Sequence, residues 1–138
     1  MAEQSAPLVK VTDLQVGYPV GIGLFRGGKR GMLMAVDGVS LQLRRGETLG
    51  LVGESGCGKS TLGRALLQLT RPTAGHVEFD GRELTSLDES ALRPLRRRMQ
   101  MIFQDPFGSL NPRLSVGEAV AEPILIHGLA DASDWRDK

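Results

Sequence analysis

The glycine-rich stretch from Gly53 to Thr61 constrains this chain more than any other feature. It fits the pattern G-x-x-x-x-G-K-[ST], a loop whose successive backbone N–H groups surround phosphate oxygens. Glycine is needed because such a backbone adopts angles that a Cβ forbids and must let phosphate approach closely. Lys59 would bring a positive charge to the terminal phosphates, and Ser60 would offer a hydroxyl ligand to Mg²⁺. The candidate phosphate-binding residues are Gly53, Ser55, Gly56, Cys57, Gly58, Lys59, Ser60 and Thr61.

The segments on either side of this loop fit a strand, loop and helix in that order. Residues 47–52 form a short and mostly apolar run, as expected of a buried parallel strand. Residues 60–69 place Leu62, Ala65, Leu66 and Leu69 on one face of a helix. The alternative is a glycine-rich turn without a ligand. It is disfavoured because such a turn does not require a Lys-Ser pair.

Length and charge narrow the class of protein. The chain has 138 residues, enough for one modest domain, and 17 basic against 16 acidic residues. A charge so nearly balanced gives no reason to expect a nucleic-acid partner. Arg96, Arg97 and Arg98 are adjacent, but a solvated helix end explains them better than a nucleic-acid surface. The single cysteine excludes an internal disulfide, and Cys57 is interpreted as a small side chain filling a small position.

The sequence offers no targeting or membrane-spanning segment. Residues 1–7 are polar and lack the basic and apolar regions of a secretory signal, so a cytosolic protein is expected. The longest apolar run, Met32–Val36, is far shorter than the ~20 residues that a spanning helix needs. Any function at a membrane would therefore require docking to another subunit.

The region before the loop is predicted to be an antiparallel sheet with one solvated face. Strands are expected at residues 8–16, 32–37 and 39–43. Tyr18-Pro19 is expected to interrupt the first of them, residues 20–31 to form a mobile loop, and Arg44–Glu47 to form a tight turn.

The region after the loop is predicted to alternate helices and strands. Pro72 should stop the first helix, and a strand and turn should follow at residues 76–81. Residues 86–99 are predicted to be a helix that Ser86 or Asp88 caps and that Pro94 bends or begins.

Two further elements are expected toward the C-terminal end of the chain. Residues 100–103 are predicted to form an apolar strand ending at Gln104, which would lie at the carboxyl edge of a parallel sheet, where ligands bind. From Ser115 onward an amphipathic helix is expected, disturbed by Pro123.

Three phrases together resemble the nucleotide-binding subunit of ABC transporters, most closely that of dipeptide and oligopeptide importers. They are residues 35–40, 46–61 and 101–113, and the resemblance extends from about Leu8 to about Leu129. It implies an α/β P-loop NTPase with a RecA-like core and an N-terminal antiparallel β subdomain. The implied division is residues 8–46 for the β subdomain, 47–105 for the P-loop core and 106–138 for the start of the helical subdomain.

The same resemblance implies roles for individual residues. The cofactors would be ATP and Mg²⁺, with Lys59 at the β and γ phosphates and Ser60 on the metal. Tyr18 would stack on adenine, the alternative being a surface tyrosine beside a proline. Gln104 would sense Mg²⁺ and the attacking water, the alternative being a polar strand end. The implied partners are transmembrane permease subunits and a second ATPase subunit, at the cytoplasmic face of the membrane.

Several family motifs do not occur in this sequence. There is no run of four apolar residues followed by Asp-Glu, and no Ser-Gly-Gly-Gln signature. His127 follows an apolar run, but the family's switch histidine belongs after the catalytic strand, which is absent. The chain is therefore expected to be the N-terminal half of a longer subunit, with negligible hydrolysis and poor solubility on its own.

Two other interpretations of the function remain open. A P-loop small-molecule kinase would share the phosphate loop but would not explain residues 104–113. A non-catalytic fragment would agree with every feature of the sequence. The transported solute is also open, with peptides implied by the resemblance and nickel or sugars handled by near relatives.

Overall fold

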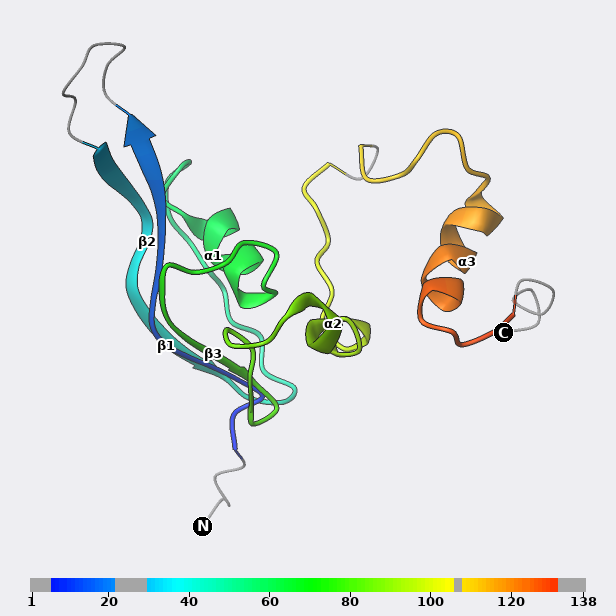
Figure 1. Cartoon of the computed structure of the whole chain (residues 1–138), viewed down its shortest axis with the longest axis horizontal. Coiled ribbons are helices and arrows are strands. Elements are labelled where there is room, and N and C mark those ends of the chain that lie inside the picture. Colours follow the sequence, from blue (N-terminus) through cyan, green and yellow to red (C-terminus); the bar gives the residue numbers. More distant parts are fainter. Residues whose placement is uncertain (1–5, 22–29, 106–107, 132–138) are drawn as a thin grey trace. The chain divides into compact units, whose positions relative to one another are not determined.

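The computed structural model describes residues 6–21, 30–105 and 108–131 (Figure 1). The chain forms two compact units, residues 1–92 and 93–138. The first unit contains β1 (Val9–Gly21), β2 (Arg30–Leu43), α1 (Lys59–Leu66), β3 (Ala74–Phe79), β4 (Arg82–Glu83) and α2 (Glu89–Leu92). The second contains the 3₁₀ turn η1 (Leu95–Arg97) and α3 (Val116–Ile126).

The first unit is built on a four-stranded sheet in the order β2-β1-β3-β4, antiparallel throughout. β1 pairs with β2 along its whole length and with β3 from Val9 to Gln15. Helix α1 lies beside this sheet (Figure 1) and contacts β1 and β2. Apolar side chains from the sheet, from α1 and from the segments after β4 form the core: Val11, Leu14, Val16, Val36, Leu62, Ala65, Val77, Phe79, Leu84 and Leu92.

The hairpin of β1 and β2 is longer and more continuous than predicted. The strand expected at residues 8–16 is confirmed, but Tyr18-Pro19 does not interrupt it, because Pro19 pairs with Met32 within β1 and β2. Among the described residues this part of β1 has no neighbour other than β2, so the missing N–H of proline is tolerated there. The strands predicted at 32–37 and 39–43 form one strand, β2.

One end of this hairpin differs from the predicted loop at residues 20–31, and the other agrees with the predicted turn after β2. Val20, Gly21, Arg30 and Gly31 belong to the strands rather than to a mobile loop, and residues 22–29 lie outside the described part of the chain. The tight turn after β2 is confirmed, because Glu47 N–H donates to the Arg44 carbonyl and Arg44 N–H donates to the Glu47 carboxylate.

Helix α1 is confirmed in position but ends earlier than predicted. Gln68 adopts the left-handed conformation, with φ +55°. The N–H groups of Gln68 and Leu69 then donate to the carbonyls of Ala65 and Arg64, the hydrogen-bond pattern of a Schellman cap. The helix is therefore stopped by its own cap before it reaches Pro72, and the predicted core residue Leu69 is half-exposed while Gln68 is buried.

Two apolar strands that the sequence predicted are not formed. Residues 47–52 and 100–103 have no strand partner among the described residues, and Val52 and Ile102 are 91% and 95% exposed. A strand persists only where a neighbour completes its backbone hydrogen bonds, and parallel strands are normally covered on both faces. The described sheet is antiparallel and offers no parallel neighbour. Both predictions are wrong for this structure, and Gln104 does not end a strand.

The long helix predicted at residues 86–99 is also wrong. Asp88 does cap a helix, because its carboxylate accepts hydrogen bonds from Ala91 N–H at 2.8 Å and from the Ser90 hydroxyl at 2.9 Å. That helix, α2, has only four residues, and Pro94 precedes the separate turn η1. Proline lacks the N–H that a continuing helix would need at this point.

In the second unit the helix predicted after Ser115 is confirmed as α3. A reciprocal capping box begins it: the Ser115 hydroxyl accepts from Glu118 N–H, and the Glu118 carboxylate accepts from Ser115 N–H. Pro123 lies inside the helix without ending it. The predicted apolar face is not covered, since Val116 and Val120 are mostly exposed.

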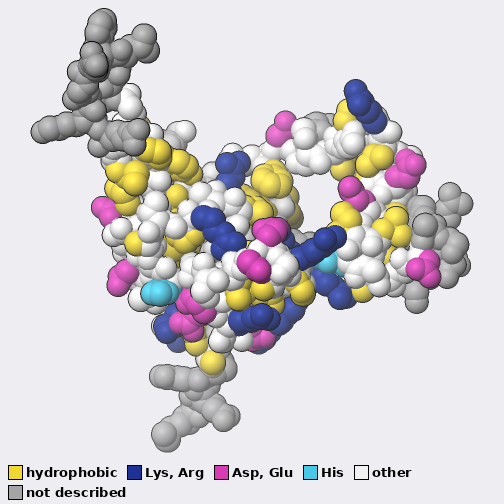
Figure 2. Space-filling view, in the orientation of Figure 1, with side chains coloured by type: hydrophobic (Ala, Val, Ile, Leu, Met, Phe, Trp, Pro, Cys, Tyr) yellow, Lys and Arg dark blue, Asp and Glu magenta, His cyan; other side chains and the backbone are white. Residues whose placement is uncertain are grey.

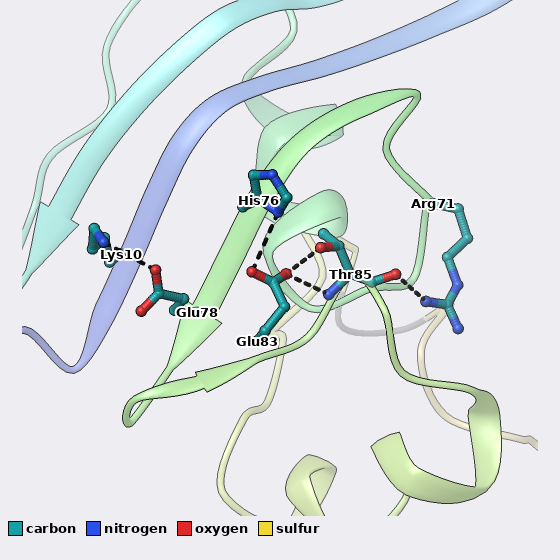
Figure 3. Close-up of polar contacts among 6 residues, drawn as sticks. All are labelled: Lys10, Arg71, His76, Glu78, Glu83 and Thr85. Atoms are coloured by element: carbon teal, nitrogen blue, oxygen red, sulfur yellow. Dashed lines mark hydrogen bonds and ion pairs between the residues drawn. The ribbon is translucent and has the colours of Figure 1, made fainter.

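A cluster of polar contacts ties β4 to its neighbours in the first unit (Figure 3). The Glu83 carboxylate accepts hydrogen bonds from the Thr85 N–H, at 3.0 Å, and from the Thr85 hydroxyl, and lies 3.4 Å from His76 Nδ1. Burial raises the pKa of Glu83, but the two hydrogen bonds from Thr85 and the charge of His76 outweigh it, so the pKa lies below its ordinary value of 4.5.

The lowered pKa of Glu83 predicts acid sensitivity of this hairpin. Its contribution to the free energy of unfolding is complete above the unfolded pKa and is lost as pH falls through the folded pKa. We expect Glu83→Gln to flatten the loss of stability between about pH 6 and pH 3, measured by urea unfolding followed by circular dichroism. Thr85→Val should flatten it to a smaller extent, since it removes the hydroxyl donor and keeps the backbone N–H donor. If the free energy of unfolding of both variants changes with pH as it does in the unmutated chain, Glu83 is not the source of the acid sensitivity.

Candidate phosphate-binding site

The glycine-rich loop lies between the turn after β2 and the first residue of α1. Gly56 and Gly58 both have positive φ, +82° and +96°, which L-residues with a Cβ rarely adopt. Gly58 is the N-cap of α1, so the loop runs directly into the helix. The loop itself is exposed from Gly53 to Cys57. The sequence prediction of a loop that opens a helix at Lys59 is confirmed.

Lys59 folds back over the loop that precedes it. Its Nζ donates to the carbonyl oxygens of Gly53, at 2.7 Å, and Glu54, at 2.5 Å, and lies 3.4 Å from Cys57 Sγ. An ammonium group has three donors, and these three contacts hold it above the turn of the loop. The positive charge is thereby fixed against the loop backbone rather than extended into solvent.

The start of α1 adds a second source of positive potential. Its first turn contains no acidic residue, and no side chain among the described residues caps it. The unopposed dipole of a helix end favours an anion at the N–H groups of its first turn. Ser60 and Thr61 occupy that turn directly after Lys59, and the Ser60 side chain is exposed. A lysine and two hydroxyl residues therefore follow one another in the first turn of α1.

Two glycines of the loop have no room for a side chain, because other atoms of the protein lie against them. A Cβ on Gly58 would lie 2.1 Å from the carbonyl oxygen of Ala35 in β2. A Cβ on Gly53 would lie 2.7 Å from Cys57 Sγ and 4.0 Å from Lys59 Nζ. At Gly56, by contrast, an added Cβ would meet no atom within 4 Å, so the loop backbone is open there. Exposed backbone beside a helix N-terminus, a lysine and a hydroxyl is a donor set that fits phosphate.

The other two predicted site residues lie outside the loop. Tyr18 is on β1, paired with Leu33, and its side chain is 43% exposed and thus available for contact. Gln104 is exposed in the second unit, on a bend rather than at a strand end. The structure thus brings together the residues from Gly53 to Thr61, whereas the roles of Tyr18 and Gln104 stay predictions.

Sequence reasoning missed one participant, the backbone carbonyl of Ala35. This oxygen is the nearest atom to the missing side chain of Gly58, from a strand more than twenty residues earlier in the chain. Every residue has a backbone carbonyl, so residue types alone do not indicate which carbonyl makes such a contact. The only signal in the sequence was the glycine at position 58 itself.

A loop of this geometry at the start of a helix, with a lysine and a hydroxyl directly after its last glycine, defines the class of P-loop nucleotide-binding proteins. Residues 36–138 match the family described as ABC transporter, and the chain belongs to that family. Membership implies nucleotide binding. No helix within the described ranges combines the length and the apolar character needed to cross a bilayer.

Curated relatives are similar over almost the whole of this chain. An oligopeptide transport ATP-binding protein of Bacillus subtilis (strain 168) is 43% identical over 138 residues, which cover 99% of this chain and 42% of that protein. A dipeptide transport ATP-binding protein of Escherichia coli (strain K12) is 45% identical over 132 residues, covering 96% and 39%. The chain therefore spans less than half the length of these relatives.

A solved structure gives the same assignment. It is a dimeric, post-hydrolysis state of an ATP-binding cassette bound to ADP and Pi, with a TM-score of 0.74 and 27% sequence identity. The match covers 94% of this chain and 53% of that cassette. The predicted α/β P-loop fold class and the resemblance to peptide-type ABC subunits are both confirmed by these comparisons.

The contact between Gly58 and β2 predicts a sharp dependence of stability on this glycine. We expect Gly58→Ala to lower the free energy of unfolding by about 2–4 kcal/mol, because the methyl group overlaps the Ala35 carbonyl and the backbone is left-handed. Gly63→Ala, in the same helix with open space around it, should instead stabilise by about 0.5–1 kcal/mol. Urea denaturation of both variants measures the difference, and equal effects would refute the contact.

Proposed function

We propose that this chain is the MgATP-binding part of an ABC transporter ATPase subunit that powers import of dipeptides or oligopeptides. The observation that carries the proposal is the phosphate loop itself, with the Lys59 ammonium held over it and Gly58 packed without a side chain at the start of α1. Similarity to ATP-binding proteins of dipeptide and oligopeptide transport supports the substrate class.

Each loop residue then has a physical task. The amides of Gly56 to Thr61 would hold phosphate oxygens, Lys59 would neutralise the β and γ phosphates, and Ser60 would hold Mg²⁺. Lys59 would exchange its bonds to the loop carbonyls for bonds to phosphate, a stronger acceptor. Tyr18 would stack on adenine through its exposed ring, and Gln104 would contact Mg²⁺ and the attacking water.

The assembly follows from the same proposal. Transmembrane permease subunits and a second ATPase subunit would be the partners, at the cytoplasmic face of the membrane, with this subunit peripheral. The similar solved cassette is described as dimeric, which supports pairing of two ATPase subunits. Exposed apolar side chains in the first unit support contacts beyond those within this chain. In Figure 2 such side chains gather over the hairpin of β1 and β2.

The first alternative, a P-loop small-molecule kinase, is set aside because residues 36–138 match the ABC transporter family. The second alternative, a non-catalytic fragment, concerns the residues that hydrolysis needs. The sequence has no apolar strand ending in Asp-Glu and no Ser-Gly-Gly-Gln signature, so the residues present bind and orient MgATP rather than polarise water.

Nucleotide affinity tests the proposal directly. We expect Lys59→Ala to weaken ATP binding by about 100-fold or more, because the terminal phosphates lose their charged donor. Isothermal titration calorimetry on the whole chain is the measurement. Lys10→Ala is the matched control: Lys10 forms an ion pair with Glu78 on the sheet, at 3.0 Å, and its loss should leave affinity unchanged. Unaltered affinity in Lys59→Ala would overturn the proposal.

The role of Ser60 as a ligand of Mg²⁺ is tested by how much Mg²⁺ increases the affinity for ATP. We expect Mg²⁺ to tighten ATP binding by the unmutated chain and to tighten it markedly less in Ser60→Ala, since the metal loses its protein hydroxyl. Affinity for ATP without Mg²⁺ should be similar in both. Ser40→Ala, which removes a hydroxyl on β2 that bonds Asp13, is the control. If Mg²⁺ increases ATP affinity equally in Ser60→Ala and in the unmutated chain, Ser60 is not a ligand of the metal.

A further inference from the structure

The pairing of β1 with β2 is irregular at three points, and the last of them along β1 lies against the phosphate loop at Gly58. Val16 pairs with Val36 and the next residue of β1, Gly17, pairs with Met34. The register therefore skips Ala35, so that two residues of β2 oppose one step of β1, which is a β-bulge. Bulges redirect the backbone of the strand that carries them and often lie next to functional sites.

The bulge directs its carbonyl group at the loop. The Ala35 oxygen and carbon are the two atoms nearest to an added Cβ on Gly58, at 2.1 and 3.2 Å. The third is Cγ2 of Val36, at 3.9 Å. The N-cap of α1 thus rests on the backbone of one bulge residue and on the side chain of the next.

Val36 gives this support its rigidity. The side chain is 5% exposed, and its pairing partner Val16 is buried as well. A buried β-branched residue has few rotamers available, so the surface that it presents to Gly58 is fixed. The loop segment from Gly53 to Cys57, by contrast, is exposed and has no strand pairing of its own.

We propose that the bulge of Ala35 and Val36 in β2 is a positioning element for the phosphate loop. It sets the place at which the loop turns into α1, and hence where the amides of Lys59 to Thr61 point. Val36 acts through Gly58 and touches no phosphate itself. The inference rests on the proposed function, because it concerns how the ATP site is held. Binding groups displaced by a fraction of an ångström lose much of their effect, so the bulge should govern affinity as well as stability.

A pair of matched truncations separates positioning from general stability. Val36 and Val77 are both buried valines of the same sheet, and Val77 lies on β3, paired with Val11. We expect Val36→Ala to weaken binding of ATP and of pyrophosphate by about tenfold, and Val77→Ala to leave both within about twofold. Titrations are made at a temperature at which both variants are folded by circular dichroism. Val36→Ile, which keeps the branched shape, should retain the affinity of the unmutated chain.

A second measurement uses the unmutated chain and so does not depend on whether a variant folds. Pyrophosphate carries the phosphate groups of ATP without its base, so it reaches the loop alone. We expect it to slow amide hydrogen exchange in the unmutated chain at residues 35–37 as well as at residues 56–61, and to leave Val77–Phe79 of β3 unchanged. The protected residues in β2 would then report the coupling between bulge and loop.

The outcomes distinguish the two proposals. If the unmutated chain binds neither ATP nor pyrophosphate, the proposed function fails. If it binds both, but Val36→Ala and Val77→Ala have equal affinities, the positioning role is overturned while nucleotide binding stands. Protection confined to the loop, with none at residues 35–37, would also overturn the positioning role.

Discussion

The structure of the first unit depends on the pairing of one strand, β1, with a neighbour on each side. β2 pairs along its whole length and β3 along its first half, and the side chains of all three build the core against α1. Because backbone groups in the interior must be hydrogen-bonded, this doubly paired strand is where the sheet is most firmly held. Segments without such a partner, at 47–52 and 100–103, leave their apolar residues in solvent.

The candidate site is attached to this sheet by close contact of backbone with backbone. Gly58 lies against the Ala35 carbonyl so closely that no side chain fits, and the charge of Lys59 is held by carbonyls of the loop itself. An anion site made of amides, a helix end and one lysine relies on precise placement of backbone, since few side chains are available to adjust. One of the three interruptions in the pairing of β1 with β2 lies at the place where that contact is made.

Local patterns in the sequence were sufficient for several features whose stabilising partner lies a few residues away. The phosphate loop and the helix after it, the cap at Asp88 and the capping box of Ser115 with Glu118 all belong to this kind. The strands predicted at 47–52 and 100–103 were wrong because they needed distant parallel neighbours. The helix predicted at 86–99 was wrong for a local reason, since it is divided at Pro94 into α2 and η1.

The residue types from Gly53 to Thr61 by themselves predicted the chemistry, because glycine, lysine and hydroxyl at that spacing are typical of loops that bind phosphate and Mg²⁺. Tertiary structure alone decided how the loop is held. The register of β1 with β2 skips Ala35, and the carbonyl so placed meets Gly58. The bulge arises in the pairing of residues about twenty positions apart, and the atom that it brings to Gly58 is a backbone carbonyl, which every residue has. The residue types of the loop therefore did not indicate this contact.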